Sequence, residues 1–538
     1  MIPDNENKGL ELGYNKELPG DAKAVILPSV WNFEEGLFRY FGVCWYEKDI
    51  VTETENILIS FGAVTGYAKV YFDGELLGEH YGGFSAFHFT KRTTAGKHRI
   101  TVSVDASSDA QTIPLPYVDW YHYGGIIRDV ELAELRDAYI ESAHYEYELS
   151  PDLHSAQVNA VVTLYSFSDV KVPLEFTFDE KIAAKTEISL KQEEKTTVTL
   201  GPVKVDNVRL WDIYRGELYS CGVSTDTDDL LDRIGFRKIE VAKKKILLNG
   251  KEIYIKGVNR HEEHPDWGFA VPAQINKRDI EIIKNMNCNA IRGSHYPNSR
   301  IFMDMLDKEG ILFYGEIPMW GFSADRMADP VVLERGLNMH REMTEQYYNH
   351  PSVVMWGLNN ECATNTSEGR KLCKVYAEHL RKKGGNRLIT FASNVIETDI
   401  CLDLVDVVSV NKYIGWYGED LSGWKKFIPW LRTRLADAGV PDKPIILSEY
   451  GAAAVYGYTS FDEGKWSEEY QAKLLCEVSK LCANEPGIVG TYAWQYCDIR
   501  SENELNRARG YNNKGLVNEY RRPKLAYYAM KELYGRIK

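Results

Sequence analysis

The chain has 538 residues, of which 44% are hydrophobic and 26% charged, and a formal net charge of −14. This length exceeds what one hydrophobic core supports, so about two to four domains are expected. The acidic balance argues against a nucleic-acid partner, and no apolar run of about 18 residues predicts a membrane span. We therefore expect a water-soluble globular protein that binds neither nucleic acid nor a membrane.

The nine cysteines are scattered along the chain, and no two of them form a C-x-x-C pair. This usage fits a reducing compartment better than a disulfide framework. The first residues show no basic segment followed by an apolar stretch, which is the pattern of a secretory signal. A cytoplasmic location is the expectation that follows.

Two β-rich blocks occupy the first part of the chain. Between about residues 23 and 135, short strands of alternating apolar residues are separated by turn residues, and Asp73-Gly74 is a hairpin signal. From about 137 to 237, further strands have the spacing of a β-sandwich of about 100 residues. We assign residues 1–136 and 137–240 to two β domains.

After Lys243, short apolar strands alternate with amphipathic helical segments up to the C-terminus. Eight strands are predicted, at residues 254–259, 289–295, 311–316, 353–359, 388–393, 407–412, 445–449 and 488–494. Eight strand–helix alternations are the number for a (β/α)8 barrel, so residues 241–538 are assigned to that α/β fold. Its chemistry is expected at the C-terminal ends of the strands, where the βα loops gather.

Two glutamates end strands on opposite sides of the predicted barrel mouth. Glu361 follows the fourth strand and Glu449 ends the seventh. Glycoside hydrolysis needs such a pair, in which one carboxylic acid protonates the leaving oxygen and one carboxylate meets the developing oxocarbenium carbon. From position alone, membership of a structural ion pair is an equal alternative for each glutamate.

The neighbours of the two glutamates favour the catalytic interpretation. Asn360 offers an amide that can bond a sugar 2-hydroxyl, an interaction that strengthens in the transition state. Tyr413 follows strand six, where a phenol can hold Glu449 ionised and oriented. Both side chains are therefore candidate members of the catalytic group.

Two further strand ends carry candidate sugar-binding residues. Trp494 after strand eight could give the sugar an apolar platform, and a buried barrel tryptophan is the alternative. His295 is a candidate sugar ligand, with a structural hydrogen-bond partner as the equal alternative. H-E-E-H at 261–264 lacks the H-E-x-x-H spacing, so no zinc site is predicted.

Several motifs together resemble glycoside hydrolase family two. They are L-P-S-V-W-N at 27–32, Y-G-G-I-I-R at 123–128, K-G-V-N-R-H-E at 256–262, S-H-Y-P at 294–297, H-P-S-V-V-M-W-G-L-N-N-E at 350–361, S-V-N-K-Y-I-G-W-Y at 409–417, S-E-Y-G at 448–451 and W-S-E-E-Y-Q at 466–471. The resemblance covers nearly the whole chain. It implies an N-terminal jelly-roll sugar-binding-like β-sandwich, an immunoglobulin-like β-sandwich and a C-terminal catalytic TIM barrel. It also implies Glu361 as acid/base and Glu449 as nucleophile, with net retention at the anomeric carbon.

Within the family, the likeness is greatest to bacterial β-glucuronidases. N-N-K-G at 512–515, followed by R-R-P-K at 521–524, resembles their N-x-K motif, which implies that Asn512 and Lys514 bind the sugar carboxylate. A lysine ammonium beside an amide donor favours a uronate over a neutral hexose by a charge-assisted hydrogen bond worth roughly 1.5–3 kcal/mol. Without the resemblance, a solvated surface turn is the default interpretation of Lys514.

The resemblance implies three more pocket residues. Asp119 matches the jelly-roll aspartate that reaches the sugar hydroxyls, and Tyr417 matches another pocket residue. The pocket arginine upstream of the N-x-K motif has two candidates, Arg507 and Arg509, and the sequence leaves this register open. Arg509 is taken as the candidate.

The chain departs from the glucuronidase pattern after strand three. It reads G-E-I-P-M-W-G-F where glucuronidases have an acidic pair followed by small residues, so Trp320 is expected to reshape the pocket. The segment 320–328 is also short, without the long entrance loop of some bacterial members. An open site that admits larger aglycones is expected.

The leading function is therefore an exo-acting β-glucuronidase that needs no cofactor or metal. The nearest alternative is a β-galacturonidase, which would use the same contacts to the sugar carboxylate. A second alternative is a β-galactosidase or β-mannosidase, in which Lys514 would have no role in substrate binding. A non-catalytic sugar-binding protein would require a lost carboxylate, whereas Glu361 and Glu449 are both present. Many members of the family that the chain resembles assemble as dimers or tetramers, so a homo-oligomer is expected.

Overall fold

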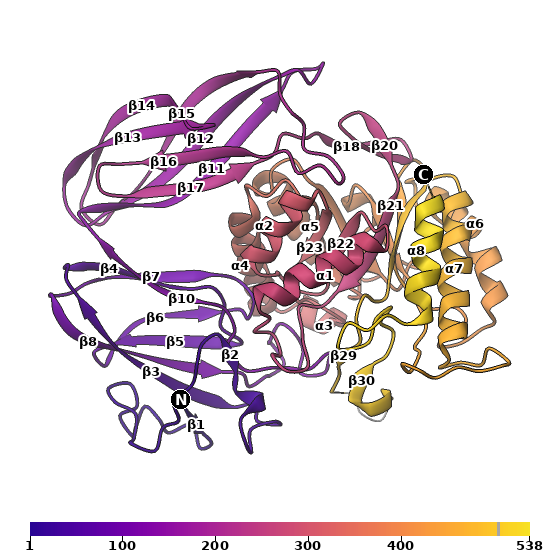
Figure 1. Ribbon diagram of the computed structural model, residues 1–538, viewed down its shortest axis with the longest axis horizontal. Helices are drawn as coiled ribbons and strands as arrows, with labels where there is room; N and C mark the ends of the chain where they lie inside the picture. Colours follow the sequence, from indigo (N-terminus) through magenta and orange to yellow (C-terminus); the bar gives the residue numbers. More distant parts are fainter. Residues whose placement is uncertain (503–505, 538) are drawn as a thin grey trace.

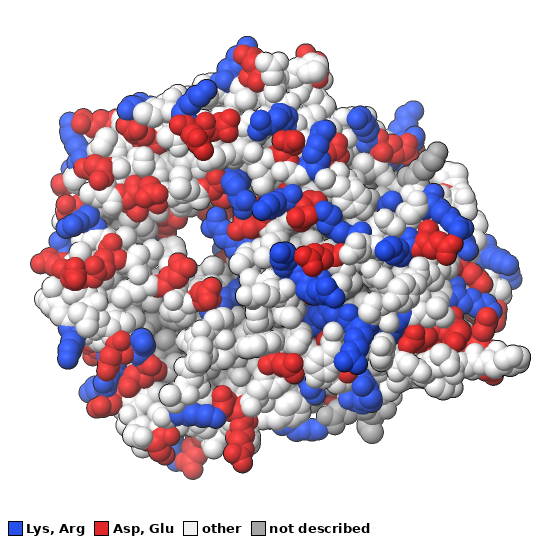
Figure 2. All heavy atoms as spheres, viewed as in Figure 1, with Lys and Arg blue, Asp and Glu red and all other residues white. Residues whose placement is uncertain are grey.

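The computed structural model describes residues 1–502 and 506–537. Two β modules lie side by side along one flank of a (β/α)8 barrel, with the first drawn in indigo and violet and the second in magenta (Figure 1). Acidic and basic side chains are interspersed over the face in Figure 2, so the acidic excess is not gathered into one patch there. Among the described helices, none is long and apolar enough to cross a membrane.

The first module is a sandwich of two antiparallel sheets. Its larger sheet has the order β1 (Ile2–Asp4), β3 (Val43–Thr52), β8 (Gly96–Asp105), β5 (Tyr67–Phe72), β6 (Glu75–Tyr81), and its smaller sheet β10 (Val130–Leu135), β4 (Asn56–Phe61), β7 (Phe87–Arg92). Apolar residues of both sheets, including Val70 and Ile59, share one core. The predicted hairpin at Asp73-Gly74 is confirmed, with φ of 49° and 85°, the positive values that a type I′ turn requires. A short ribbon of β2 (Ser29–Val30) and β9 (Gly125–Ile126) completes the module.

The second module is a seven-stranded sandwich, as expected for an immunoglobulin-like domain. One sheet has the order β11 (Ala138–Leu149), β12 (Ser155–Ser166), β15 (Lys195–Asp206), and the other β14 (Lys181–Leu190), β13 (Val170–Phe178), β16 (Tyr219–Ser224), β17 (Asp229–Ile234). Along β12 every second residue is buried, because alternate side chains of a strand point to opposite faces of a sheet. The buried face packs against the second sheet in one apolar core.

The third module is a closed barrel of eight parallel strands, which confirms all eight predicted strands. They are β21 (Ile255–Arg260), β22 (Ala290–Gly293), β23 (Leu312–Glu316), β24 (Val353–Asn360), β25 (Leu388–Ser393), β26 (Val408–Asn411), β27 (Ile445–Tyr450) and β28 (Ile488–Ala493). Nearly every residue of these strands is buried, since a parallel sheet is covered on both faces. A small sheet of β18 (Ile239–Ala242), β19 (Lys245–Leu248) and β20 (Lys251–Ile253) precedes the barrel.

Helices surround the barrel (Figure 1). They are α1 (Ala273–Asn285), α2 (Arg300–Glu309), α3 (Ala324–Met327), α4 (Pro330–Tyr347), α5 (Ser367–Lys383), α6 (Trp424–Asp437), α7 (Glu468–Asn484) and α8 (Leu525–Arg536). Between β28 and α8 the chain forms a small ribbon of β29 (Ile499–Arg500) and β30 (Tyr511–Asn512). All nine cysteines are unpaired.

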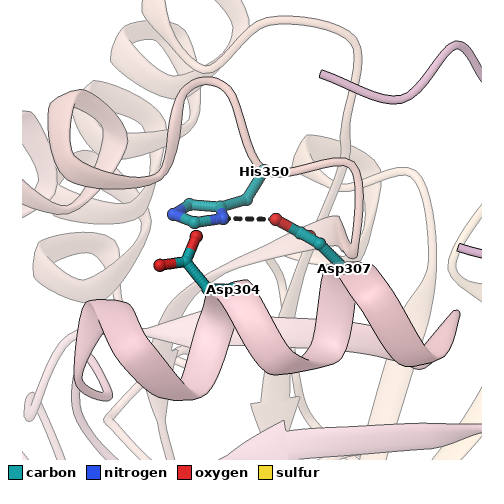
Figure 3. Close-up of side chains that lie close together, drawn as sticks. All are labelled: Asp304, Asp307 and His350. Carbon is teal, nitrogen blue, oxygen red and sulfur yellow. Dashed lines mark hydrogen bonds and ion pairs between the residues drawn. The ribbon is translucent and has the colours of Figure 1, made fainter. Parts of the chain in front are cut away.

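A buried ion pair ties α2 to the segment before β24, at the end of the barrel opposite the loops that carry the glutamates. His350 Nδ1 lies 2.5 Å from Asp307 Oδ2, and the Ser352 amide donates to Asp307 Oδ1 at 3.0 Å. Asp304 lies beside them on α2 (Figure 3) and pairs with Arg233 of β17 at 3.1 Å. Although the three side chains have a spacing that could hold a metal, both Asp307 oxygens already accept bonds from the protein. We interpret the group as a structural link.

Candidate active site

A cavity of about 820 Å³ opens at the carboxyl ends of the barrel strands. Glu361 and Glu449 both line it, as the sequence predicts. The first β module closes one side with the segment that contains Asp119 and Trp120. The site is therefore shared between the barrel and the N-terminal sandwich.

Glu449 is held by two donors. It ends β27 and is only 4% exposed. The Tyr413 hydroxyl donates to its Oε2 at 2.7 Å, as expected for this phenol, and the Arg292 guanidinium donates to its Oε1 at 2.7 Å. Donors on both oxygens fix the orientation of this carboxyl group, as the proposed nucleophile requires.

Arg292, at the end of β22, lies outside the motifs that indicate the site in the sequence. It is fully buried and donates to both oxygens of Glu316, to Asn259 and to Asn360, besides Glu449. These partners come from four other strands of the barrel. A charged residue inside an otherwise apolar parallel strand is the signal that could have identified it, because such residues are almost never fully buried unless paired.

Glu361 has the opposite electrostatic environment. It follows β24 with a φ of 53°, and its Oε1 accepts a bond of 2.8 Å from Asn411. Burial, and then the charge of Glu449, raise the pKa of Glu361 to about 8. This carboxyl group is therefore protonated at neutral pH, as a general acid must be. A separation of about 5–5.5 Å between the two carboxyl groups, the value for a retaining enzyme, stays a prediction.

The pKa of Glu361 predicts the pH dependence of turnover. Cleavage needs Glu361 protonated and Glu449 ionised, so kcat/KM should fall as pH rises through about 8 and should also fall at acidic pH. Two interacting carboxyl groups titrate as a pair, so the two apparent values belong to the dyad. A pH profile with an aryl glycoside measures both limbs. A flat profile from about pH 4 to 8 would contradict this assignment.

Asn360 has an unpaired amide donor beside Glu361, although it is not among the residues that line the cavity. Its Oδ1 accepts from Arg292 at 2.6 Å and from Asn411 at 3.1 Å. Its Nδ2 is buried and has no partner among the described residues. Because an unsatisfied buried donor is unfavourable, a sugar hydroxyl that accepts from Nδ2 would gain a bond the free enzyme lacks.

His295 and Trp494 form a stacked pair on the cavity wall, with ring centroids 5.1 Å apart. His295 Nδ1 lies 2.7 Å from Glu316 Oε1, and its Nε2 lies 4.0 Å from Glu449 Oε1. Trp494 is only 4% exposed. Both residues therefore line the cavity, as a sugar-binding role requires, and are also buried and packed, as a structural role requires.

Lys514 is not a solvated turn residue, because it is 1% exposed and lines the cavity. Its Nζ donates to the Tyr417 hydroxyl at 2.8 Å and lies 5.6 Å from the centre of the Tyr413 ring. Burial lowers the pKa of Lys514 below its usual value. A desolvated ammonium of this kind gains a favourable interaction when an anion enters the cavity.

Of the two candidate pocket arginines, the structure places Arg507 in the cavity and not Arg509. Arg507 lines the cavity and donates to the Tyr417 hydroxyl at 3.2 Å, whereas Arg509 pairs with Glu519 at 2.8 Å with half of its side chain exposed. Arg509 has a φ of 63°. In a regular strand, residues 507 and 509 would point to the same face. The left-handed conformation at Arg509 turns the chain, so the two side chains point in different directions.

Asp119 links Arg507 and Asn512. Its Oδ1 accepts from Arg507 Nε at 2.8 Å, and its Oδ2 accepts from Asn512 Nδ2 at 2.9 Å and from the Arg507 Nη2 group. Ser501 also donates to Oδ1, at 3.1 Å. Both oxygens therefore orient protein donors in this structure.

Trp320 lines the cavity and packs edge-on against Trp120, with ring centroids 6.2 Å apart. Its backbone forms a bridge with Asn360, beside the acid. Nine residues, four of them in α3, separate Trp320 from the start of α4 at Pro330. The short segment thus brings an indole to the side of the cavity that carries Glu361.

Three family models match consecutive parts of the chain. They are the sugar binding domain of glycosyl hydrolases family 2 at residues 39–136, the model named glycosyl hydrolases family 2 at 138–237, and the family's TIM barrel domain at 239–538. Their order follows the three modules of the structure.

Relatives and solved structures match over nearly the full length. A β-glucuronidase of Streptococcus agalactiae is 29% identical over 95% of this chain and 91% of its own length, and the human β-glucuronidase is 26% identical over 99% and 89%. The structure of a β-galacturonidase from Eisenbergiella tayi bound to galacturonate superposes with a TM-score of 0.92 and 33% identity, covering 97% of this chain and 95% of that one. A Ruminococcus gnavus β-glucuronidase superposes with a TM-score of 0.88 and 26% identity, covering 99% and 95%. The chain belongs to glycosyl hydrolase family 2, and it is a glycosidase.

Proposed function

We propose that this glycosidase is a retaining, exo-acting β-D-glucuronidase that releases glucuronic acid from its aglycone. The observation that carries the proposal is the buried ammonium of Lys514 in the same cavity as Glu361 and Glu449. Of the three cations that line that cavity, Arg507 pairs with Asp119 and Lys412 pairs with Glu397, whereas Lys514 has no carboxylate partner among the described residues. A uronate carboxylate supplies the matching anion, which a neutral hexose lacks.

The contacts of the two glutamates give each a role. In the first step the ionised Glu449 attacks the anomeric carbon, while Glu361 gives its proton to the leaving oxygen. In the second step Glu361, now ionised, takes a proton from the water that attacks the glycosyl-enzyme. Formation of the ester bond consumes the charge of Glu449, one cause of the raised pKa of Glu361, so that pKa falls when Glu361 must act as a base.

Other contacts orient the sugar. The Asn360 amide would donate to the 2-hydroxyl, and Asn512 and Lys514 would hold the carboxylate together with Arg507. Asp119 supports this role through its bonds to Arg507 and Asn512, which fix both donors before substrate binds. Donors that are already oriented lose little conformational freedom on binding.

A β-D-galacturonidase is the second candidate. It is favoured by the likeness to the E. tayi β-galacturonidase, which was solved with galacturonate bound. Galacturonate differs from glucuronate only in the configuration at C4, and the carboxylate contacts would serve both. Trp320 and Asp119 are the residues expected to distinguish the two epimers. Both line the cavity, and Trp320 lies where the sequence departs from the glucuronidase pattern.

Three aryl substrates test these alternatives side by side: a β-D-glucuronide, a β-D-galacturonide and a β-D-galactoside with the same aglycone. We expect kcat/KM to be highest for the glucuronide and lowest for the galactoside. A higher value for the galacturonide would select the second candidate. Preference for the galactoside would exclude both uronidase assignments.

Retention of configuration is a further prediction of the two-step mechanism. Two inversions at one carbon give a product with the configuration of the substrate, so the first uronic acid released should be the β anomer. Proton NMR during the first minutes of hydrolysis distinguishes it from the α anomer before mutarotation mixes them. Initial release of the α anomer would exclude Glu449 as a nucleophile.

We further propose a cytoplasmic homo-oligomer that acts on small glycosides. The scattered, odd-numbered cysteines support the reducing compartment. Sedimentation of the purified protein measures its assembly, and a monomer at all concentrations would contradict this part of the proposal.

A further inference from the structure

We propose that the buried ion pair between Asp498 and Lys524 is a positioning device for the loop that presents Asn512 and Lys514 to the substrate carboxylate. This inference rests on the proposed uronidase function. Both side chains of the pair are fully buried, and Lys524 Nζ lies 2.8 Å from Asp498 Oδ1. Neither residue lines the catalytic cavity.

The Lys524 ammonium joins three segments of the chain. Its Nζ donates to the Ala454 carbonyl at 2.7 Å, to Asp498 at 2.8 Å and to the Asn513 carbonyl at 3.0 Å, which uses all three of its protons. Ala454 follows the nucleophile strand β27, and Lys524 is the residue before α8. A fully satisfied ammonium of this kind fixes the distance between the nucleophile segment and the loop.

The pair contacts the loop on both sides of Lys514. Asn513 supplies a carbonyl to Lys524, and the Gly515 amide donates to Asp498 Oδ1 at 2.8 Å. The backbone of Lys514 itself is held by the Gln495 amide, which donates to its carbonyl at 2.9 Å. The position of the Lys514 ammonium in the cavity therefore depends on bonds that begin at Asp498 and Lys524.

Polar partners are required at this place because the loop turns its backbone groups inward. Asn513 and Gly515 are buried, and apolar side chains at 498 and 524 would leave the Asn513 carbonyl and the Gly515 amide without these bonds. Directional hydrogen bonds also place the loop more closely than apolar packing does. A misplacement of about 1 Å in a binding group can reduce catalytic efficiency on the order of 10²-fold.

Gly515 allows the loop to lie directly on the backbone beside Asp498. A Cβ at this position would lie 2.2 Å from the Asp498 amide nitrogen and 2.4 Å from the Val517 carbonyl oxygen. Both obstacles are backbone atoms, so Gly515→Ala must displace the loop. It does so without removing either charge, which makes it an independent test of positioning.

Two variants and one matched control test the proposal. Because removal of one partner leaves an uncompensated buried charge, the pair is replaced together, as Asp498→Asn with Lys524→Met. Gly515→Ala is the second variant. The control is Asp307→Asn, which removes the carboxylate from another buried pair, that with His350 (Figure 3), at the opposite end of the barrel. Thermal melting shows the temperature range in which each variant is folded, and kinetics are measured there.

For the double variant and for Gly515→Ala, we expect kcat/KM with the aryl uronide to fall by at least about 10-fold. Most of the loss should lie in KM, with kcat within about 3-fold of the parent, because Glu361 and Glu449 are not touched. The rate with the matching neutral hexoside should change by less than about 3-fold. Asp307→Asn should lower the melting temperature and leave the ratio of uronide to hexoside rates unchanged.

A loss shared equally between uronide and hexoside, or confined to kcat, would overturn the proposal, as would unchanged uronide kinetics in Gly515→Ala. If the double variant does not fold, Gly515→Ala alone decides by the same criteria. Lys514→Ala serves as the reference for the proposed function. If Lys514→Ala is not selective for the uronide, the uronidase assignment fails. If it is selective while Gly515→Ala is not, only the positioning role fails.

Discussion

Glu449→Ala should remove nearly all turnover, with a fall in kcat on the order of 10⁴-fold or more, because it removes the carboxylate proposed to form the glycosyl-enzyme. The two donors that hold Glu449, Tyr413 and Arg292, would remain in place but would have no carboxylate to orient. Steady-state kinetics with an aryl uronide measure the loss. A variant that keeps more than about 1% of the parent rate would exclude Glu449 as the nucleophile.

The stability of this variant needs a separate control. Glu449 is 4% exposed, so it is not the solvent-exposed carboxylate that its place at the barrel rim suggests. Its removal takes one anion from the fully buried Arg292, which keeps its bonds to both oxygens of Glu316. We therefore expect Glu449→Ala to fold with a reduced melting temperature. Glu449→Gln keeps an acceptor for Arg292, so it should be equally inactive but less destabilised.

Added azide distinguishes a lost nucleophile from a damaged site. In Glu449→Ala the small anion can enter the space of the missing carboxylate and attack the anomeric carbon from the same side. The expected product is a glycosyl azide of inverted configuration, without recovery of normal hydrolysis. An azide of retained configuration would contradict the assignment of Glu449.

The fold could be predicted from the sequence because its signals are local. Most barrel strands are short apolar runs that end at a polar residue, and the hairpin at Asp73-Gly74 depends on two adjacent residues. Glu361 and Glu449 could be predicted for the same reason, because each directly follows or ends a strand whose end points to the barrel mouth.

The contacts that hold the site residues in place could not be predicted from local sequence signals. Arg292 contacts residues that are 24, 33, 68 and 157 positions away in the sequence, and only closure of the barrel brings them together. The choice between Arg507 and Arg509 depends on one left-handed residue in an irregular segment, where side-chain direction follows no period. The bonds of Asp119 to Arg507 and Asn512 cross from the first module to the barrel, and they depend on how two domains pack.

Substrate class is tested by Lys514→Ala. If Asn512 and Lys514 hold the sugar carboxylate, removal of the ammonium leaves that anion with Arg507 as the remaining cation of this corner. We then expect kcat/KM for a uronide to fall by at least about 10-fold, since roughly 1.4 kcal/mol corresponds to one decade. A neutral glucoside or galactoside lacks the anion, so its rate should change little or should rise. The measurement is kcat/KM for the uronide and the hexoside with the same aglycone.

Lys412→Ala is the matched control, because Lys412 lines the same cavity but pairs with Glu397 at 2.6 Å. It removes an equal charge without touching the Asn512 and Lys514 corner, so it should affect both substrates alike. If Lys514 were only a structural support for its loop, Lys514→Ala would reduce the uronide and hexoside rates together. If Lys514 had no role at the site, Lys514→Ala would leave both rates unchanged. Either equal response would exclude the uronidase assignment. It would leave the roles of Glu361 and Glu449 intact, because their contacts with Asn411, Tyr413 and Arg292 do not involve Lys514.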